Sequence, residues 1–279
     1  MKAKILVLLA ACLFSFHLPS ANAAAPKKLL VVTTTAGFKH TSIPTLTKML
    51  EQLGKQTGEF SIDVILQPTN RPGPELTAAM KEALLKLSPE NLAHYDGVVF
   101  ASTTGELPIP DPQGLLDWIK AGHAFIGIHA ASDTFHRWPG YIEMLGGEFD
   151  HHGQQLSVDC LNQDPQHPAT AQLPKTWTIA QEEVYQFKNY NPTNVHELLI
   201  LDKRPQAPFT PGHYAMAWSK SYGTGRVFYT SLGHREDLID TDPDLPNRRN
   251  DVEAAKLYQK HILGGVEWAL GLKMGAPTP

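Results

Sequence analysis

The sequence is poor in cysteine, in clustered positive charge and in long apolar runs. Its 279 residues include only two cysteines and carry a formal net charge of -4, with no basic run. Nucleic acid is therefore not an expected partner, because binding a phosphate backbone requires clustered Lys and Arg. The only pronounced apolar run lies near the N-terminus and is too short to cross a bilayer, so we expect no membrane span.

Several catalytic signatures are also missing. The sequence has no Gly-x-Ser-x-Gly elbow, no Gly-x-Gly-x-x-Gly fingerprint, no P-loop and no Cys-x-x-Cys pair. These absences argue against a serine hydrolase, a dinucleotide-dependent enzyme, an NTPase and a zinc ribbon.

The N-terminus has the pattern of a signal peptide. Two lysines precede an apolar run at 5–16, and Ala-Asn-Ala at 21–23 is a small-x-small cleavage site. The pattern predicts a signal peptide at 1–23, a mature domain at 24–279 and a periplasmic or secreted protein. Residues 9–12 resemble a lipobox, which would anchor a lipoprotein at Cys12. That alternative is less favoured, because the apolar run continues beyond it and the cleavage site follows.

Cleavage would leave Cys160 as the only cysteine and exclude an internal disulfide. Residues 155–160 alternate between polar and apolar, which predicts a strand. Cys160 is therefore interpreted as a buried structural thiol rather than a reactive one.

The first half of the chain alternates between apolar runs and helically spaced segments. This order predicts parallel βαβ units in one α/β domain, with no linker dividing the chain. The predicted strands are 29–35, 60–66, 95–102 and 124–128, and the predicted helices are 41–53, 75–87, 88–90 and 115–121. The second half is richer in strands, at 155–160, 177–179, 195–202, 214–219 and 226–231, and ends in a helix at 251–270.

Polar residues follow four of the predicted strands. Ligands of open parallel sheets bind just beyond the carboxyl ends of the strands, where these segments would meet. We therefore expect one shared pocket. The segments supply His40, Thr104, Glu106, His129 and His234.

His129 is the central candidate, because it lies at the strand-to-helix turn where such folds place nucleophiles. A satisfied core histidine is the alternative. Asp133, four residues on, is expected to face His129 and orient its ring. His136 gives this trio a metal-like helical spacing, although a structural pairing explains it equally well. His40 has a helix-capping alternative, which Thr41 or Ser42 would fulfil without it.

Two adjacent pairs add further candidates. His151 and His152 point in opposite directions on an extended chain, so at most one faces the pocket. One carboxylate of Glu182 and Glu183 is a candidate general acid or base, and solvent exposure of both is the alternative.

These segments together resemble the trehalose-utilisation (ThuA-like) family over about residues 28–272. The matching stretches are 37–42, 127–135, 138–152, 167–168, 182–185 and 225–234. The resemblance implies a flavodoxin-like, class I glutamine amidotransferase-like three-layer sandwich with a mostly parallel sheet. It also implies a role in using trehalose or another disaccharide. True amidotransferases carry a catalytic Cys at the turn where His129 stands, so a thiolate acyl-enzyme mechanism is excluded there.

The favoured hypothesis is a hydrolase, isomerase or lyase acting on a disaccharide or a 3-keto-sugar. His129 would be the central acid or base, oriented by Asp133 and surrounded by His40, His152, His234 and Glu183. Substrate would contact Thr104, Glu106, Trp138, Tyr141 and Tyr185. The alternative for the three aromatic residues is a place in the core, which explains Trp138 at least as well. A metal-assisted version places a divalent ion such as zinc on His129, His152 and His234.

Two alternatives stay open at this point. One is a sugar-binding module without catalysis, and the other is a structural domain whose histidines are scattered. The sequence also leaves open whether the protein is a monomer or a homodimer.

Overall fold

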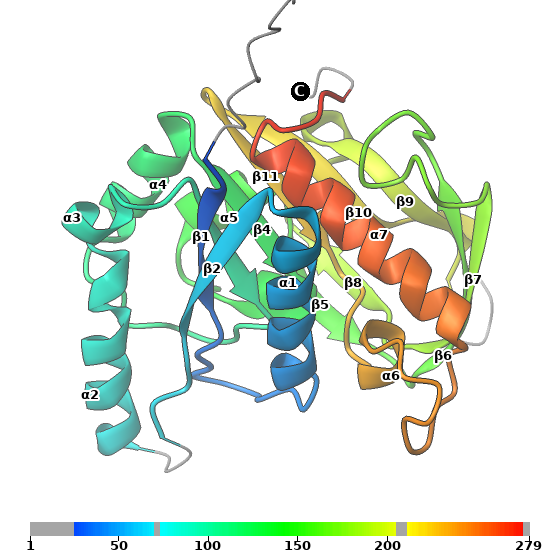
Figure 1. Ribbon diagram of the computed structural model, residues 1–279, viewed down its shortest axis with the longest axis horizontal. Helices are drawn as coiled ribbons and strands as arrows, with labels where there is room; N and C mark the ends of the chain where they lie inside the picture. The colour runs from blue at the N-terminus through cyan, green and yellow to red at the C-terminus, as the bar shows by residue number, and fades with distance from the viewer. Residues whose placement is uncertain (1–24, 70–72, 205–210, 276–279) are drawn as a thin grey trace, which may run out of the picture.

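The computed structural model describes residues 25–69, 73–204 and 211–275 (Figure 1). The predicted signal peptide and Cys12 lie outside the described residues. Within these ranges, no helix combines the length and the apolar character that crossing a bilayer requires.

A nine-stranded sheet forms the centre of the molecule, in the order β2-β1-β3-β4-β11-β10-β9-β6-β7. The five strands from β2 to β11 are parallel, and the remaining four continue the sheet in antiparallel fashion. Their bounds are β1 Lys27–Val32, β2 Phe60–Ile65, β3 Gly97–Ala101, β4 Ala124–Ile128, β6 Leu156–Asn162, β7 Thr176–Glu182, β9 His196–Lys203, β10 Pro211–Tyr222 and β11 Gly225–Thr230. A separate antiparallel pair joins β5 (Glu148–His152) to β8 (Tyr185–Lys188).

Helices cover both faces of the sheet (Figure 1), which confirms the predicted α/β sandwich. One layer comprises α1 (Ile43–Thr57), α6 (Glu236–Ile239) and α7 (Val252–Ala269). The other comprises α2 (Pro74–Ala83), α3 (Pro89–Leu92), α4 (Pro112–Lys120) and α5 (Pro139–Leu145). Alternate residues of each buried strand pack into opposite layers, so Leu29 and Val31 join the first core and Leu30 and Val32 the second.

The predicted elements are present, with changes at their ends. β4 has the predicted bounds, and Cys160 is fully buried as expected. Ser42 does not cap α1, because its hydroxyl donates to the carbonyl of Gly233 instead. Four short elements, α5, α6, β5 and β8, were not predicted from the sequence. They have four to seven residues each, too few for a periodic pattern to emerge.

Candidate active site

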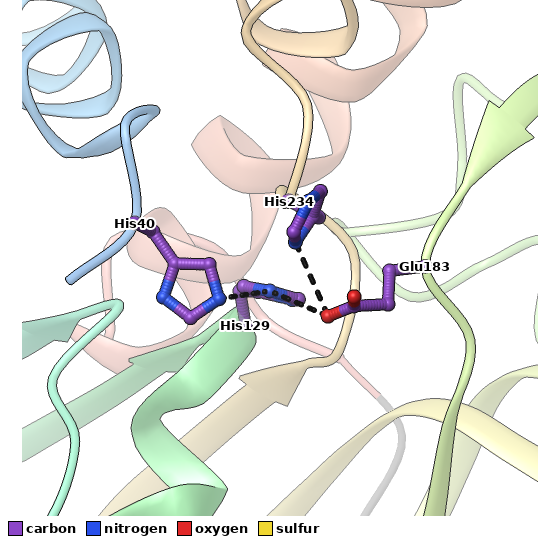
Figure 2. Close-up of side chains that lie close together, drawn as sticks. All are labelled: His40, His129, Glu183 and His234. Carbon is purple, nitrogen blue, oxygen red and sulfur yellow. Dashed lines mark hydrogen bonds and ion pairs between the residues drawn. The ribbon is translucent and has the colours of Figure 1, made fainter. Parts of the chain in front are cut away.

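Four side chains from distant parts of the chain meet at the carboxyl edge of the parallel strands (Figure 2). His40 lies in the loop after β1, His129 directly follows β4, and His234 follows β11. Glu183 follows β7 and completes the group. One ligand atom from each of these residues lies within 4.8 Å of the other three. We call these four residues the His/Glu cluster.

The backbone of His129 is in the left-handed region, with φ of 51°. A non-glycine residue in this region is strained, and such strain is concentrated at functional sites. The turn projects the imidazole from the end of β4 into the cluster, as an elbow does for a nucleophile. This position matches the one predicted for His129.

A backbone carbonyl fixes the tautomer of His129. Nδ1 lies 2.7 Å from the carbonyl oxygen of Ser231, which can only accept a hydrogen bond. Nδ1 therefore carries the proton of the neutral ring, and Nε2 presents a lone pair to the cluster. Burial and the neighbouring His40 and His234 hold the pKa of His129 well below its usual value, which favours this neutral form.

Three groups surround this lone pair. His40 Nε2 lies 3.2 Å from His129 Nε2, the Tyr185 hydroxyl lies at 3.1 Å and Glu183 Oε2 at 3.7 Å. Burial, reinforced by His234, lowers the pKa of His40 to about 4. Two neutral imidazoles thus stand with their Nε2 atoms facing each other.

Glu183 joins the cluster to the cavity wall through its two oxygens. Oε2 lies 3.1 Å from Nδ1 of His234, and Oε1 lies 3.1 Å from Nδ1 of His152. Burial lowers the pKa of His234, but the carboxylate of Glu183 outweighs burial and the net pKa is raised. His152 is half-exposed and reaches only the outer oxygen.

A second, fully buried carboxyl group positions His234. Glu182 Oε1 accepts hydrogen bonds from the backbone N–H of His234 at 2.8 Å and of Gly233 at 3.3 Å. Burial raises the pKa of Glu182 to about 7. Ser42 donates to the carbonyl of Gly233 at 3.1 Å, which ties the turn before His234 to the start of α1.

The cluster borders a cavity of about 330 Å³. Its lining comprises Phe38, His40, Asp133, Phe149, His152, Glu183, Tyr185 and His234. Three of these residues are aromatic: Phe149 and Tyr185 have ring centroids 4.4 Å apart, and Phe38 is 66 % exposed at the rim. A polar cavity of about 310 Å³ lies beside it, also lined by His234, together with Arg235, Gln155 and Asn247.

The prediction that Asp133 orients His129 is wrong. Asp133 bonds to Nε2 of His136 at 2.7 Å, and the other ring nitrogen of His136 meets Glu148 at 2.6 Å. Residues His129–Asp133 form a 3-10 turn rather than an α-helix, so the expected facing of residues four apart does not arise. His136 therefore belongs to a structural pairing, whereas Asp133 still lines the cavity.

Four predicted substrate contacts lie outside the cavity. Tyr141 is buried with its hydroxyl donating to the carbonyl of Ala131, and Trp138 stacks on Tyr141, so both are core aromatics. Thr104 is fully buried and donates to the carbonyl of Phe38, which fastens the loop that carries His40. Glu106 is exposed and accepts a hydrogen bond from the backbone of Arg137.

The two adjacent histidines of β5 diverge as an extended chain requires. His151 turns toward Asp150 at 2.8 Å, while His152 turns toward Glu183. Of the predicted metal trio, His129 and His234 lie in the His/Glu cluster, and His40 occupies the place foreseen for His152.

The supporting contacts of the cluster were not predicted from the sequence. The Ser231 carbonyl gives no sequence signal, because every residue has one. Glu182 and Glu183 are adjacent, and the sequence does not show which of the two side chains faces the cluster. Phe38 and Phe149 line the cavity and lie within the matched stretches of sequence. Phe38 is two residues before His40, and Phe149 is three residues before His152. An aromatic residue close to a predicted histidine was the available signal.

Comparisons with known proteins agree with this architecture. The family model described as "Trehalose utilisation", ThuA, matches residues 28–269. No curated protein matches the sequence.

Among solved structures, a ThuA-like protein from Parabacteroides merdae is similar with a TM-score of 0.68 and 20% identity, covering 91% of this chain and 93% of that one. A ThuA-like protein from Bacteroides uniformis has a TM-score of 0.59 and 19% identity, with coverage of 90% and 95%. A Salmonella typhimurium protein described as cytoplasmic has a TM-score of 0.51 and 11% identity, with coverage of 87% and 98%. These likenesses show the fold, which is glutamine amidotransferase-like.

Proposed function

The chain belongs to the trehalose-utilisation (ThuA) family, and from this premise we propose that it is an enzyme acting on a disaccharide or its 3-keto form. The reaction takes place at the His/Glu cluster. The observation that carries this proposal is the convergence of three imidazoles and a carboxylate, contributed by four separate segments, beside an open cavity. Titratable groups gathered in a cleft are the usual mark of a catalytic centre.

The cluster is equipped for proton transfer. The Nε2 lone pair of His129 lies beside the hydroxyl of Tyr185, and Tyr185 lines the cavity. Groups arranged in this way can deprotonate a water molecule, a sugar hydroxyl or the carbon next to a keto group. Hydrolysis and proton abstraction next to a carbonyl are the two reaction classes that such chemistry serves.

The cavity wall supports a sugar as the substrate. Phe38, Phe149 and Tyr185 offer flat apolar faces, while His152 and Asp133 offer hydrogen-bonding groups on the same cavity. A sugar ring needs both, because its C–H faces pack on aromatic rings and its hydroxyl groups require polar partners. A volume of about 330 Å³ lies in the range of small-molecule sites.

A substrate screen tests this proposal. Plain disaccharides and their 3-keto forms are incubated with the wild type and with His129→Asn, and products are followed by NMR. We expect turnover of at least one sugar by the wild type and its loss in His129→Asn. His136→Ala is the matched control, because His136 belongs to the neighbouring structural pairing, and it should retain turnover.

The screen also separates the enzyme from a sugar-binding module. A module would bind a sugar, more weakly in the variant than in the wild type, and neither protein would convert any sugar. That outcome, or the absence of any sugar bound or converted, contradicts the proposal.

We further propose that the protein is exported. The lysines, apolar run and Ala-Asn-Ala site of residues 1–23 support this location. Intact mass of the protein recovered from the periplasm or medium should correspond to a chain beginning at residue 24. Recovery of full-length protein from the cytoplasm alone would contradict export.

A further inference from the structure

The polar atoms of the His/Glu cluster lie close together with few hydrogen bonds among them. Of the contacts among its four residues, only the one between the Nε2 atoms of His40 and His129 is a hydrogen bond. Glu183 Oε2 lies 3.7 Å from His129 Nε2, beyond hydrogen-bonding distance. Nδ1 of His234 is buried and has no hydrogen bond, although Glu183 Oε2 is 3.1 Å away. Buried polar groups normally satisfy one another, so this exception requires an explanation.

The spacing of these atoms matches the edges of a metal coordination shell. A tetrahedral zinc ion with bonds of about 2.1 Å holds neighbouring ligand atoms about 3.4 Å apart. The three contacts of the cluster measure 3.2 Å, 3.7 Å and 3.1 Å, and every remaining pair lies within 4.8 Å. The first coordination shell therefore lies close to its bound geometry before any side chain moves.

The outer contacts of His129 also match those of a metal ligand. A ligating histidine usually donates its second ring N–H to a carbonyl or carboxylate, which fixes the tautomer and aims the other nitrogen at the metal. His129 does this through Nδ1 and the Ser231 carbonyl at 2.7 Å. Glu182 supports His234 in a related way, by holding the backbone of its turn.

We propose that His40, His129, His234 and Glu183 bind a divalent transition-metal ion of the zinc class. Imidazole nitrogens select zinc and its neighbours in the first transition row, whereas magnesium and calcium require shells of oxygen. This site replaces the predicted trio, since His40 takes the position given to His152. His152 contacts the cluster through the outer oxygen of Glu183, its Nδ1 also lies 2.8 Å from the carbonyl oxygen of Gly153, and it is not a ligand.

The inference deepens the proposed function by changing what the cluster does. An ion bound here faces the cavity of about 330 Å³. It would act as a Lewis acid toward a sugar oxygen or lower the pKa of a bound water. The lone pairs of the cluster would then bind the ion. The hydroxyl of Tyr185, 3.1 Å from His129 Nε2, would lie close to the bound ion.

A direct binding measurement tests the site without using activity. Tag-free protein is stripped with a chelator, titrated with Zn²⁺ by calorimetry and assayed for bound metal by mass spectrometry. We expect one Zn²⁺ per chain and at least a 100-fold loss of affinity in each of His40→Ala, His129→Asn and His234→Ala. His136→Ala and His151→Ala are matched controls that should leave affinity unchanged. Binding that is absent, or that survives all three cluster variants, overturns the proposal.

A second measurement uses the wild-type protein, so its result does not depend on the folding of any variant. Co²⁺ bound to the wild type in place of Zn²⁺ should give the intense visible absorption of a four- or five-coordinate histidine site. A weak, octahedral-type spectrum overturns the proposal. Failure of the metal site and failure of the proposed function are distinguishable. Sugar turnover that persists in metal-free protein rejects the metal alone, and metal binding without any sugar turnover rejects the function alone.

Discussion

Two groups of three histidines occupy this molecule, and they differ in how the rings are used. The His/Glu cluster brings His40, His129 and His234 together around one carboxylate. The second group, His167, His196 and His261, packs near the C-terminal helix, and its rings bond separately to nearby groups. His261 donates to the carbonyl of Ala169 at 2.8 Å, and His167 accepts from the N–H of the same residue at 3.2 Å.

Burial alone does not separate these groups. His129, His167 and His261 are all fully buried, and burial lowers the pKa of His167 and of His261 to about 4. Unpartnered ring nitrogens also occur in both groups. The two groups differ in whether the potential ligand atoms of their side chains converge on one point. Within the described ranges, only the His/Glu cluster places three or more potential ligand atoms within 4.8 Å of one another. A site is therefore recognised by where the lone pairs meet.

The largest expected effect comes from substituting one histidine of each group in turn. His129→Asn should lower kcat/KM for the sugar about 10³-fold, because it removes the central imidazole. Asparagine tolerates the left-handed backbone, so the urea midpoint should change little. His261→Gln should show the reverse pattern, with retained turnover and a lower midpoint. Equal loss of turnover in both variants would erase the distinction between the groups.

A smaller effect is expected from the buried carboxyl group that supports the cluster. Glu182→Ala should weaken Zn²⁺ binding about 10- to 100-fold, because the backbone N–H groups of Gly233 and His234 lose the one oxygen that accepts from both. Glu182→Gln should restore most of the affinity, since its amide oxygen can accept the same bonds. Calorimetric titration measures both variants, and equal affinities of Glu182→Ala and wild type would show that Glu182 does not position His234.

His261 of the second group should make the fold sensitive to acid. Because the folded pKa of His261 is about 4 and the unfolded value is near 6.5, the unfolded chain takes up this proton first as pH falls. Stability is thus unaffected by this group above pH 7 and declines between pH 6.5 and 4. The loss from pH 7 to pH 5 is about 2 kcal/mol. Urea unfolding at both pH values should show a decline smaller by this amount in His261→Gln, and an unchanged decline contradicts the assignment.

The smallest effect is expected at the rim of the cavity. Phe38→Ala removes an exposed ring that lines the site without touching the fold's core. An aromatic contact of about 1 kcal/mol corresponds to roughly a fivefold rise in KM, with kcat unchanged. Phe38→Tyr, which keeps the ring, should preserve KM. A fall in kcat instead of a rise in KM would place Phe38 in the chemistry.

The fold could be predicted from the sequence because buried parallel strands produce strong local patterns. β4 is apolar and buried at every position, and its bounds were predicted without error. The rule that ligands gather beyond strand ends also placed His40, His129 and His234 at a common edge. Those three residues are the part of the site that topology alone determines.

The remaining parts depend on contacts that have no local pattern. The role given to Asp133 assumed an α-helix after β4, and a 3-10 turn with a left-handed first residue stands there instead. Tyr141 and Tyr185 are both aromatic residues in matched motifs, yet one fills the core and the other lines the cavity. Only the packing of α5 and β8 distinguishes them.

The hydrogen bond from Ser42 to the carbonyl of Gly233 joins the two loops that carry His40 and His234. His40 stands two residues before its donor, and His234 directly follows its acceptor. Because of this bond, we expect an outward displacement of one loop to displace the other loop or to break the bond. Entry and escape of anything held between the two rings should therefore be a single concerted event, with amide hydrogen exchange rising together in both loops.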